Sequence, residues 1–412
     1  MRRRGEAAVL IALAVCAGTA CGSIASPARV ESKHFVIAYD SETSFAYVQL
    51  VERGLEAAYD AFVVHSSFST FAAAVEVRIS NDDIDGMGAE YLETDAMGDP
   101  LPVIEIAPQT SMAAAADAMS IGLSLEEAVL STTAHEFFHV LQDYASLHGE
   151  GDVSESAFIE PLATAAQEIA APSADDYVDA AVDFFFAPDA MSFFDRGYDG
   201  GIFWVFVLDR YGGLDAVRRV MAASATADGA QAIDRAFAGQ GLTFLDLWAK
   251  FAAALAANAL PDADAVAKLT QVWRAELGLA ELWLPVPIAT ARWSGRPVTM
   301  DRVTEDSPAG AVLGYSDSAL NSSLHVVHPY GIDVVAIEPQ SSAPLVISVV
   351  AEQATDFRIA FVARRATSWD LLSLSGRELV VRDPSRYDEI RVVLTRGETG
   401  TGSYTVRLST PS

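Results

Sequence analysis

Two histidines four residues apart, with a glutamate directly after the first, are the residues of this sequence best suited to chemistry. They form the run His135-Glu136-Phe137-Phe138-His139. On a helix, residues four apart lie on one face, so both imidazoles can reach a single ion. Neutral imidazole is a good Zn²⁺ ligand, and zinc lowers the pKa of a bound water toward neutrality. Glu136, one step round the helix, is placed to take a proton from that water as a general base.

The residues around this run predict that it lies in the middle of a helix. Residues 124–127 read Ser-Leu-Glu-Glu, which has the residue types of a capping box and opens a helix. The periodic apolar pattern then continues to Leu147, and Gly149 can end the helix. The two histidines are therefore expected on a rigid element.

A hydrolytic zinc site needs a third protein ligand and one open coordination position. The residues after His139 lack the further histidine of a metzincin, so a downstream glutamate is the alternative. The candidates are Glu150, Glu155, Glu160 and Glu168. Glu160 is favoured, because a helix that starts there, with Pro161 at its first position, would run antiparallel to the motif helix and point Glu160 at the metal. Glu155 is nearer in the sequence but is better explained as a solvated acid.

These spacings resemble the gluzincins, the thermolysin-like clan in which His-Glu-x-x-His is followed by a distant glutamate. They also resemble a group of poorly characterised bacterial metalloproteases with a Glu-x-x-Ala-Thr helix and a Tyr-Gly-rich stretch running into Ile-Phe-Trp. This chain has Glu-Pro-Leu-Ala-Thr at 160–164 and Tyr-Asp-Gly-Gly-Ile-Phe-Trp at 198–204. The resemblance covers residues 34–260. It implies a zinc metallopeptidase with Zn²⁺ held by His135, His139 and Glu160.

The same resemblance implies roles for other residues. Gluzincins often place a Tyr or His before a helix, where it donates to the oxyanion of the tetrahedral intermediate, and Tyr198 is at such a position. A packed aromatic is the alternative for Tyr198. Thr164 follows Glu160 by one helical turn and could contact a metal ligand, although an ordinary helix-face hydroxyl is favoured.

The clan also implies how substrate is held. The strand predicted at residues 101–107 would be the edge strand that pairs with an extended substrate. The Gly-x-Met-Glu-Asn signature of aminopeptidases is absent, and Gly-Ala-Glu-Tyr at 88–91 matches it poorly. An endopeptidase is therefore expected.

The apolar pattern predicts an α+β fold. Residues 33–107 alternate strand and helix signals, and residues 110–280 are nearly all helical. Beyond residue 298, short β-branched runs at regular spacing predict a β-sandwich, at 324–327, 332–337, 345–350, 357–362, 379–381, 390–394 and 404–408. With the resemblance, this predicts a thermolysin-like metallopeptidase domain at 31–290, with a mixed sheet and a helical subdomain, and an accessory β-sandwich at 298–412.

Residues 1–30 predict export from the cytoplasm. Three arginines at 2–4 precede an apolar segment at 7–17, which is the pattern of a signal peptide. Thr-Ala-Cys at 19–21 resembles a bacterial lipobox, which would make Cys21 a lipid anchor; simple secretion is the alternative. The chain is thus expected as a cell-envelope lipoprotein or a secreted protein.

The charge of the chain narrows its function further. Acidic residues outnumber basic ones by 56 to 27, a formal charge of −29, which excludes nucleic acid as a partner. The only cysteines are Cys16 and Cys21, so a thiol protease is excluded too. Hydrolysis of proteins or peptides is expected, and the alternative is an inactive surface lipoprotein that uses the protease fold to bind. The intact His-Glu-x-x-His argues against that alternative, because loss of activity usually removes the glutamate first.

Overall fold

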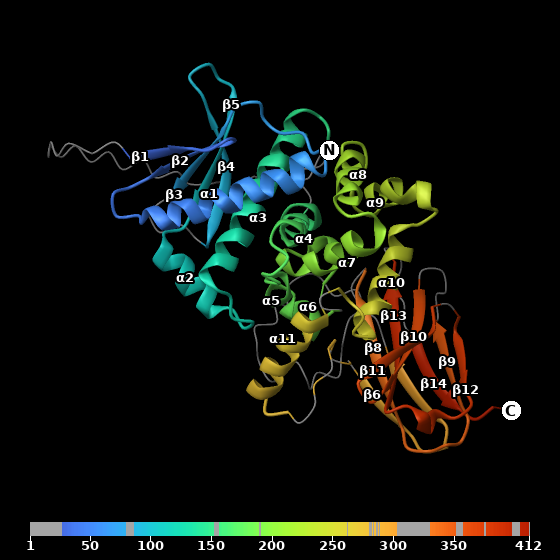
Figure 1. The fold of residues 1–412 in the computed structure, drawn as a ribbon. Coiled ribbons are helices and arrows are strands. Elements are labelled where there is room, and N and C mark those ends of the chain that lie inside the picture. The colour runs from blue at the N-terminus through green and yellow to red at the C-terminus, as the bar shows by residue number, and fades with distance from the viewer. Residues whose placement is uncertain are drawn as a thin grey trace, which may run out of the picture.

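A mixed five-stranded sheet forms the first part of the fold (Figure 1). The computed structural model describes residues 27–79, 86–151, 156–188, 191–261, 263–279, 282, 284, 285, 287, 289–302, 330–351, 357–374, 376–397 and 404–411. The strands are β1 (Ala28–Glu31), β2 (Phe35–Tyr39), β3 (Val75–Ile79), β4 (Gly88–Thr94) and β5 (Pro100–Ile106). Their order is β1-β2-β3-β5-β4, with β2, β3 and β5 parallel and β4 antiparallel to β5. The expected signal peptide and Cys21 lie outside the described residues.

The edge of this sheet differs from the sequence prediction. β5 was expected at the edge, but it lies between β3 and β4, and β4 is the edge strand. The expectation came from the resemblance, and Pro102 is compatible with an edge because proline cannot donate a hydrogen bond to a neighbouring strand. In the structure the pairing of β5 with β3 begins at Val103, so Pro102 lies just before the paired residues and no hydrogen bond to β3 is required of it. Residues 101–107 thus contain a strand, as predicted, but the prediction that this strand lies at the edge of the sheet was wrong.

Helices α1 (Phe45–Tyr59), α2 (Gln109–Ala118) and α3 (Leu125–Leu147) accompany the sheet. The predicted capping box is present at the start of α3: Glu127 N donates to Ser124 Oγ at 3.2 Å, and Ser124 N donates to Glu127 Oε2 at 2.8 Å. Phe137 packs edge-on against Phe35, at 5.3 Å between ring centroids. This contact ties α3 to the sheet layer, and α3 also packs against α4, where the site lies.

The next part of the chain is helical, as its periodicity predicts. Its helices are α4 (Glu160–Ala170), α5 (Tyr177–Ala180), α6 (Val182–Phe186), α7 (Gly201–Tyr211), α8 (Leu214–Ser224), α9 (Gly229–Phe237), α10 (Phe244–Ala256) and α11 (Ala263–Glu276). Short 3₁₀ turns at Ser156–Phe158 and Tyr198–Gly200 precede α4 and α7. Trp204 and Trp248 are fully buried and belong to one large apolar core. The described part of the chain is an α+β fold, and that class is confirmed.

Two sheets that share a core form the C-terminal part. One has the order β11-β10-β13-β8-β6 and the other β12-β9-β14-β7. Their bounds are β6 Ala289–Trp293, β7 Val298–Arg302, β8 Ile332–Pro339, β9 Leu345–Ala351, β10 Phe357–Arg365, β11 Ser368–Ser373, β12 Glu378–Val381, β13 Glu389–Arg396 and β14 Tyr404–Ser409. Apolar residues from both sheets face one another around Trp293 and Phe361. The strand predicted at 324–327 lies outside the described residues.

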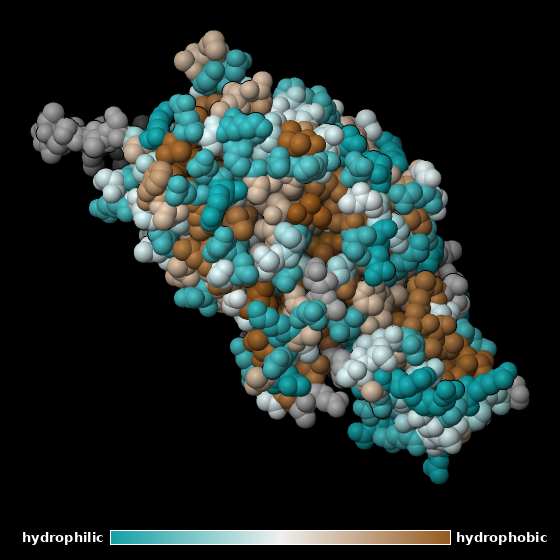
Figure 2. Space-filling view, viewed as in Figure 1, coloured by the Kyte–Doolittle hydropathy of each residue, from teal (hydrophilic) through white to brown (hydrophobic). Residues whose placement is uncertain are grey.

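The surface of the molecule is mostly hydrophilic on the face drawn in Figure 2, with hydrophobic residues in separate patches. The described helices include none that combines the length and the apolar character needed to cross a membrane. The C-terminal sheets contact α10 through the buried Arg391, which donates to the carbonyl oxygens of Ala256 at 3.4 Å and Pro285 at 3.2 Å. The candidate site lies between α3 and α4, at the end of the helical part that is away from the C-terminal sheets.

Candidate metal centre

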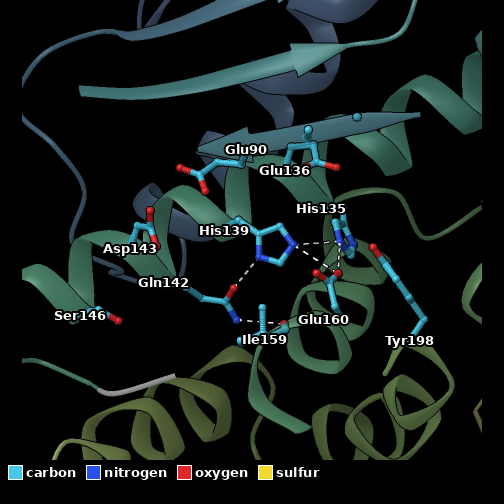
Figure 3. A pocket seen from close by; sticks show the side chains of 12 residues that line it. Glu90, His135, Glu136, His139, Gln142, Asp143, Ser146, Ile159, Glu160 and Tyr198 are labelled. Carbon is cyan, nitrogen blue, oxygen red and sulfur yellow. Dashed lines mark hydrogen bonds and ion pairs between the residues drawn. The ribbon is translucent and has the colours of Figure 1, made fainter. Parts of the chain in front are cut away.

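Three side chains that could hold a metal ion meet where α3 faces the start of α4 (Figure 3). His135 and His139 come from consecutive turns of α3, and Glu160 is the first residue of α4. His135 Nε2 lies 3.0 Å from His139 Nε2 and 3.1 Å from Glu160 Oε2, and His139 Nε2 lies 3.5 Å from the same oxygen. All three ligand atoms lie within 4.8 Å of one another.

Of the four glutamates that the sequence suggests as the third ligand, Glu160 is the one that the structure places beside the two histidines. Glu160 alone joins the two histidines in the group of possible ligands found among the described residues. Glu150 is exposed after the end of α3, and Glu168 lies two turns further along α4. Glu155 lies outside the described residues. The helix that begins at Glu160, with Pro161 in its first turn, therefore brings this carboxylate to the histidines.

Gln142 ties His139 to the segment that carries Glu160. Its Nε2 donates to the carbonyl oxygens of Phe158 at 2.7 Å and Ile159 at 3.1 Å. A carbonyl oxygen can only accept, so the NH₂ end of the amide must point that way and Oε1 must face His139. Oε1 lies 2.7 Å from His139 Nδ1 and accepts its proton. His139 therefore presents an unprotonated Nε2 to the site in its neutral form.

His135 is held in the same way by Gln167, whose Oε1 lies 2.8 Å from His135 Nδ1. Each neutral imidazole then carries its proton on Nδ1 and a lone pair on Nε2. Two lone pairs 3.0 Å apart, next to a carboxylate oxygen, repel one another unless a cation lies among them. Two imidazole nitrogens and one carboxylate are ligands that Zn²⁺ and other transition metals accept. The residues therefore fit a metal ion.

The charges of the three candidate ligands shift the pKa values of Glu160 and His139. Burial favours the neutral form of Glu160, but hydrogen bonds from His135 and His139 outweigh it and hold the pKa of Glu160 well below its ordinary value. Burial likewise opposes protonation of His139, but its hydrogen bond to Glu160 and the charge of that carboxylate raise the pKa of His139 to about 9. In the metal-free protein at neutral pH, His139 is therefore protonated, and its positive charge takes the place of the charge of a metal ion.

Metal affinity should for this reason rise with pH. Below the His139 pKa of about 9, a metal must displace the proton on His139, so the association constant is expected to increase about tenfold per pH unit between pH 6 and 8. Calorimetric titration with Zn²⁺ in two buffers of different ionisation enthalpy should show about one proton released per ion at pH 7. An affinity that does not change with pH, with no proton released, would contradict this coupling.

Glu136 points into the same pocket from the side of the sheet, and in Figure 3 it lies across the imidazoles from Glu160. It is 7 % exposed, and burial raises its pKa, although His135 and His139 partly offset this. Gly88, at the start of β4, passes directly over it. A Cβ at position 88 would lie 2.7 Å from Glu136 Cγ and 2.8 Å from Oε1. The position of the carboxylate therefore depends on a glycine that the sequence did not single out.

We expect Gly88→Ala to displace Glu136 without disturbing the metal ligands. Because a misplacement of about 1 Å can cost about 100-fold in rate, any hydrolysis that uses Glu136 should slow by about that factor in kcat. Zinc affinity should stay unchanged, since the three atoms nearest to that Cβ belong to Glu136 and Thr132 and not to a metal ligand. Gly239→Ala is the matched control, because no atom lies within 4 Å of a Cβ at that position. Equal kcat values for the two variants would contradict the steric argument.

The pocket around these residues has a volume of about 570 Å³ and is rich in carboxylates. β4 contributes Gly88, Ala89 and Glu90, and α3 contributes Asp143 beyond the histidines. Burial and the nearby charge of Asp143 raise the pKa of Glu90 to about 8. None of the described lining residues is Lys or Arg. Glu90 was noticed in the sequence only as part of a poor signature match, yet it lies beside Glu136.

Tyr198 stands at the other side of the pocket, in the 3₁₀ turn before α7. Its ring stacks on that of His135, with centroids 5.7 Å apart and an interplanar angle of 21°. Burial and the charge of Glu160 raise the pKa of Tyr198 further above neutrality, so its hydroxyl remains a donor. The turn is held by the buried Arg196, which is paired with Asp199.

The hydroxyl of Thr164 makes no hydrogen bond to a described metal ligand. It is 2 % exposed, and a Cβ at Gly201 would lie 2.7 Å from its Cγ2, so it packs where α4 meets α7. Its Oγ1 has no hydrogen-bond partner among the described residues. Thr164 thus contributes to helix packing, and the glutamines hold the histidines instead.

Comparison with known proteins gives no further guide to the function: no protein-family model matches the chain, and a search of curated proteins found no match.

Proposed function

We propose that this protein is a zinc-dependent metallopeptidase of the thermolysin-like, gluzincin type. The observation that carries this proposal is the convergence of two Nε2 lone pairs and the Glu160 carboxylate in an open pocket that also holds the carboxylate of Glu136. Three protein ligands leave a coordination position for water or substrate, which is the arrangement of catalytic rather than structural zinc. His135, His139 and Glu160 would hold the ion.

Zinc in this site would polarise the scissile carbonyl and make a water acidic enough to attack it at neutral pH. Glu136 would accept the proton of that water and pass it to the leaving amine. The burial that raises its pKa favours this exchange, because a carboxylate with a higher pKa is a better base. Tyr198, protonated and beside His135, would donate to the oxyanion of the tetrahedral intermediate.

The edge strand β4 would hold the substrate. Its residues 88–90 line the pocket, and one side of β4 pairs with β5 while the other pairs with no described strand. An extended peptide can add to such an edge by main-chain hydrogen bonds. The substrate would then run past Glu136 in a fixed register, which suits cleavage inside a polypeptide. β4 would thus hold the substrate in place of residues 101–107, for which the resemblance implies this role.

We further propose that the enzyme acts outside the cytoplasm, either anchored through Cys21 or secreted. The signal-like residues 1–30 support this proposal. Mass spectrometry of the mature N-terminus distinguishes a lipid-modified Cys21 from a free, cleaved end.

A single purification tests the main proposal. The protein is isolated, its zinc content is measured, and cleavage of unfolded casein is followed before chelation, after chelation and after Zn²⁺ is restored. Bound zinc with cleavage that disappears and returns supports a metallopeptidase. Bound zinc without cleavage of casein or of a peptide library supports the inactive binding lipoprotein instead, and a failure to bind zinc overturns the metal centre itself.

A further inference from the structure

A buried aspartate that touches no possible metal ligand lies behind His135. Asp176, which is 7 % exposed and directly precedes α5, accepts a hydrogen bond from Gln167 Nε2 at 2.5 Å. Its second oxygen accepts from the hydroxyl of Ser131, which lies on α3 one turn before His135. Gln167 in turn contacts His135 Nδ1 at 2.8 Å. The four side chains form a closed path that begins and ends on α3.

The direction of every hydrogen bond in this path follows from Asp176. A glutamine amide has an accepting end and a donating end, so Gln167 alone would allow either proton position on His135. An ionised carboxylate has no proton to give, so Asp176 requires the NH₂ end of Gln167. Oε1 of Gln167 must then face His135 and accept from Nδ1–H. Asp176 thereby determines which nitrogen of His135 is free for a metal.

We propose that Asp176 is a positioning residue for the metal centre, which acts through Gln167 to keep the Nε2 lone pair of His135 directed at the ion. This inference rests on metal binding by the site and not on peptide hydrolysis. At His139 the carbonyl oxygens of Phe158 and Ile159 have the same effect on Gln142. A mutation cannot replace these main-chain acceptors. It can replace the side chain of Asp176, so the orientation of Gln167 is the one that mutation can reverse.

Two single substitutions should each weaken the site. In Asp176→Asn the new amide can donate as well as accept, so Gln167 is free to turn its NH₂ toward His135 Nδ1 and to favour a proton on Nε2. In Gln167→Glu two carboxylates face each other, which disturbs the acceptor at His135. Loss of an outer partner of a metal-binding histidine costs about 10- to 100-fold in affinity, and we expect that loss in the Zn²⁺ association constant of each variant.

The double variant Asp176→Asn/Gln167→Glu should recover zinc binding. The carboxylate at position 167 then accepts from His135 Nδ1, and the amide at position 176 donates to it while still accepting from Ser131. Competition with a zinc chelator measures all four proteins, and recovery to within a few-fold of the original affinity supports the proposal. Single variants that bind as tightly as the original protein, or losses that multiply in the double variant, would overturn it.

A spectroscopic measurement separates this role from a merely structural one. In metal-free protein labelled with ¹⁵N-histidine, under conditions in which both imidazoles are neutral, the His135 proton is expected on Nδ1, facing Gln167 Oε1. In Asp176→Asn a share of it should move to Nε2, while circular dichroism shows that the fold is kept. Asp333→Asn is the matched control, because Asp333 is another buried acid, with a bond from Tyr404 in the C-terminal sheets. An Nε2-protonated His135 in the original protein would contradict the proposal directly.

Discussion

Glu136→Gln is expected to abolish peptide hydrolysis while zinc stays bound. A general base in this position contributes about 10²- to 10⁴-fold, and kcat should fall by that factor. Glutamine has the shape of glutamate, so the close approach of Gly88 to this side chain is kept. The ligand atoms of His135, His139 and Glu160 are unchanged. The loss therefore has one cause, the missing basic oxygen, and the measurement is kcat for a fluorogenic peptide beside the zinc content of the same sample.

Glu90→Gln is the control that tests whether Glu136 or Glu90 is the base. Glu90 is a second carboxylate of the same pocket, and its raised pKa of about 8 would also suit a base at neutral pH. It lies on β4 and not beside His135 on α3, so its loss should change kcat far less than the loss of Glu136. A large effect of Glu90→Gln with a small effect of Glu136→Gln would assign the base to Glu90.

The sequence predicts the metal-facing half of this site because helix geometry connects it directly to residue spacing. Side chains four apart on a helix must lie together, and the Ser124 capping box and the turn at Gly149, whose φ is +68°, limit the helix as expected. Glu160 could be chosen from four glutamates because Pro161 indicates a helix start. The structure places each of these residues as the spacing requires.

The supporting half of the site depends on tertiary contacts that leave little trace in the sequence. Asp176 follows His135 by 41 residues, and no periodic pattern links them. Gln142 was detectable in principle, because it lies three residues after His139 on the same helix. β4 was missed because its residues, Gly-Ala-Glu-Tyr-Leu-Glu-Thr, contain little of the β-branched character by which strands are recognised. Gly88 carries no signal of its role in the sequence, and only the structure shows that its small size makes room for Glu136.

Glu160→Gln should remove zinc from a protein that remains folded. The substitution takes away the negative ligand, and its NH₂ group can donate to the lone pairs of His135 and His139 that would otherwise bind the ion. Loss of an outer partner alone costs about 10- to 100-fold in affinity, so loss of a ligand should exceed about 100-fold. The backbone at this point is held separately, by Gln142 through the carbonyl oxygens of residues 158 and 159. Zinc content, chelator competition and thermal unfolding measure the two effects apart.

The same substitution should change the proton affinity of His139. The hydrogen bond and the charge of Glu160 raise the pKa of His139 to about 9, so removal of the charge should return this pKa toward or below the ordinary value for histidine. A group with a raised pKa in the folded state adds stability below its unfolded-state pKa and loses it as pH rises through the folded value. The metal-free original protein should therefore lose stability between about pH 6.5 and 9, and Glu160→Gln should not. Glu150→Gln, at an exposed glutamate after α3, should keep both zinc and the original pH profile; if it loses zinc while Glu160→Gln keeps it, the third ligand is Glu150.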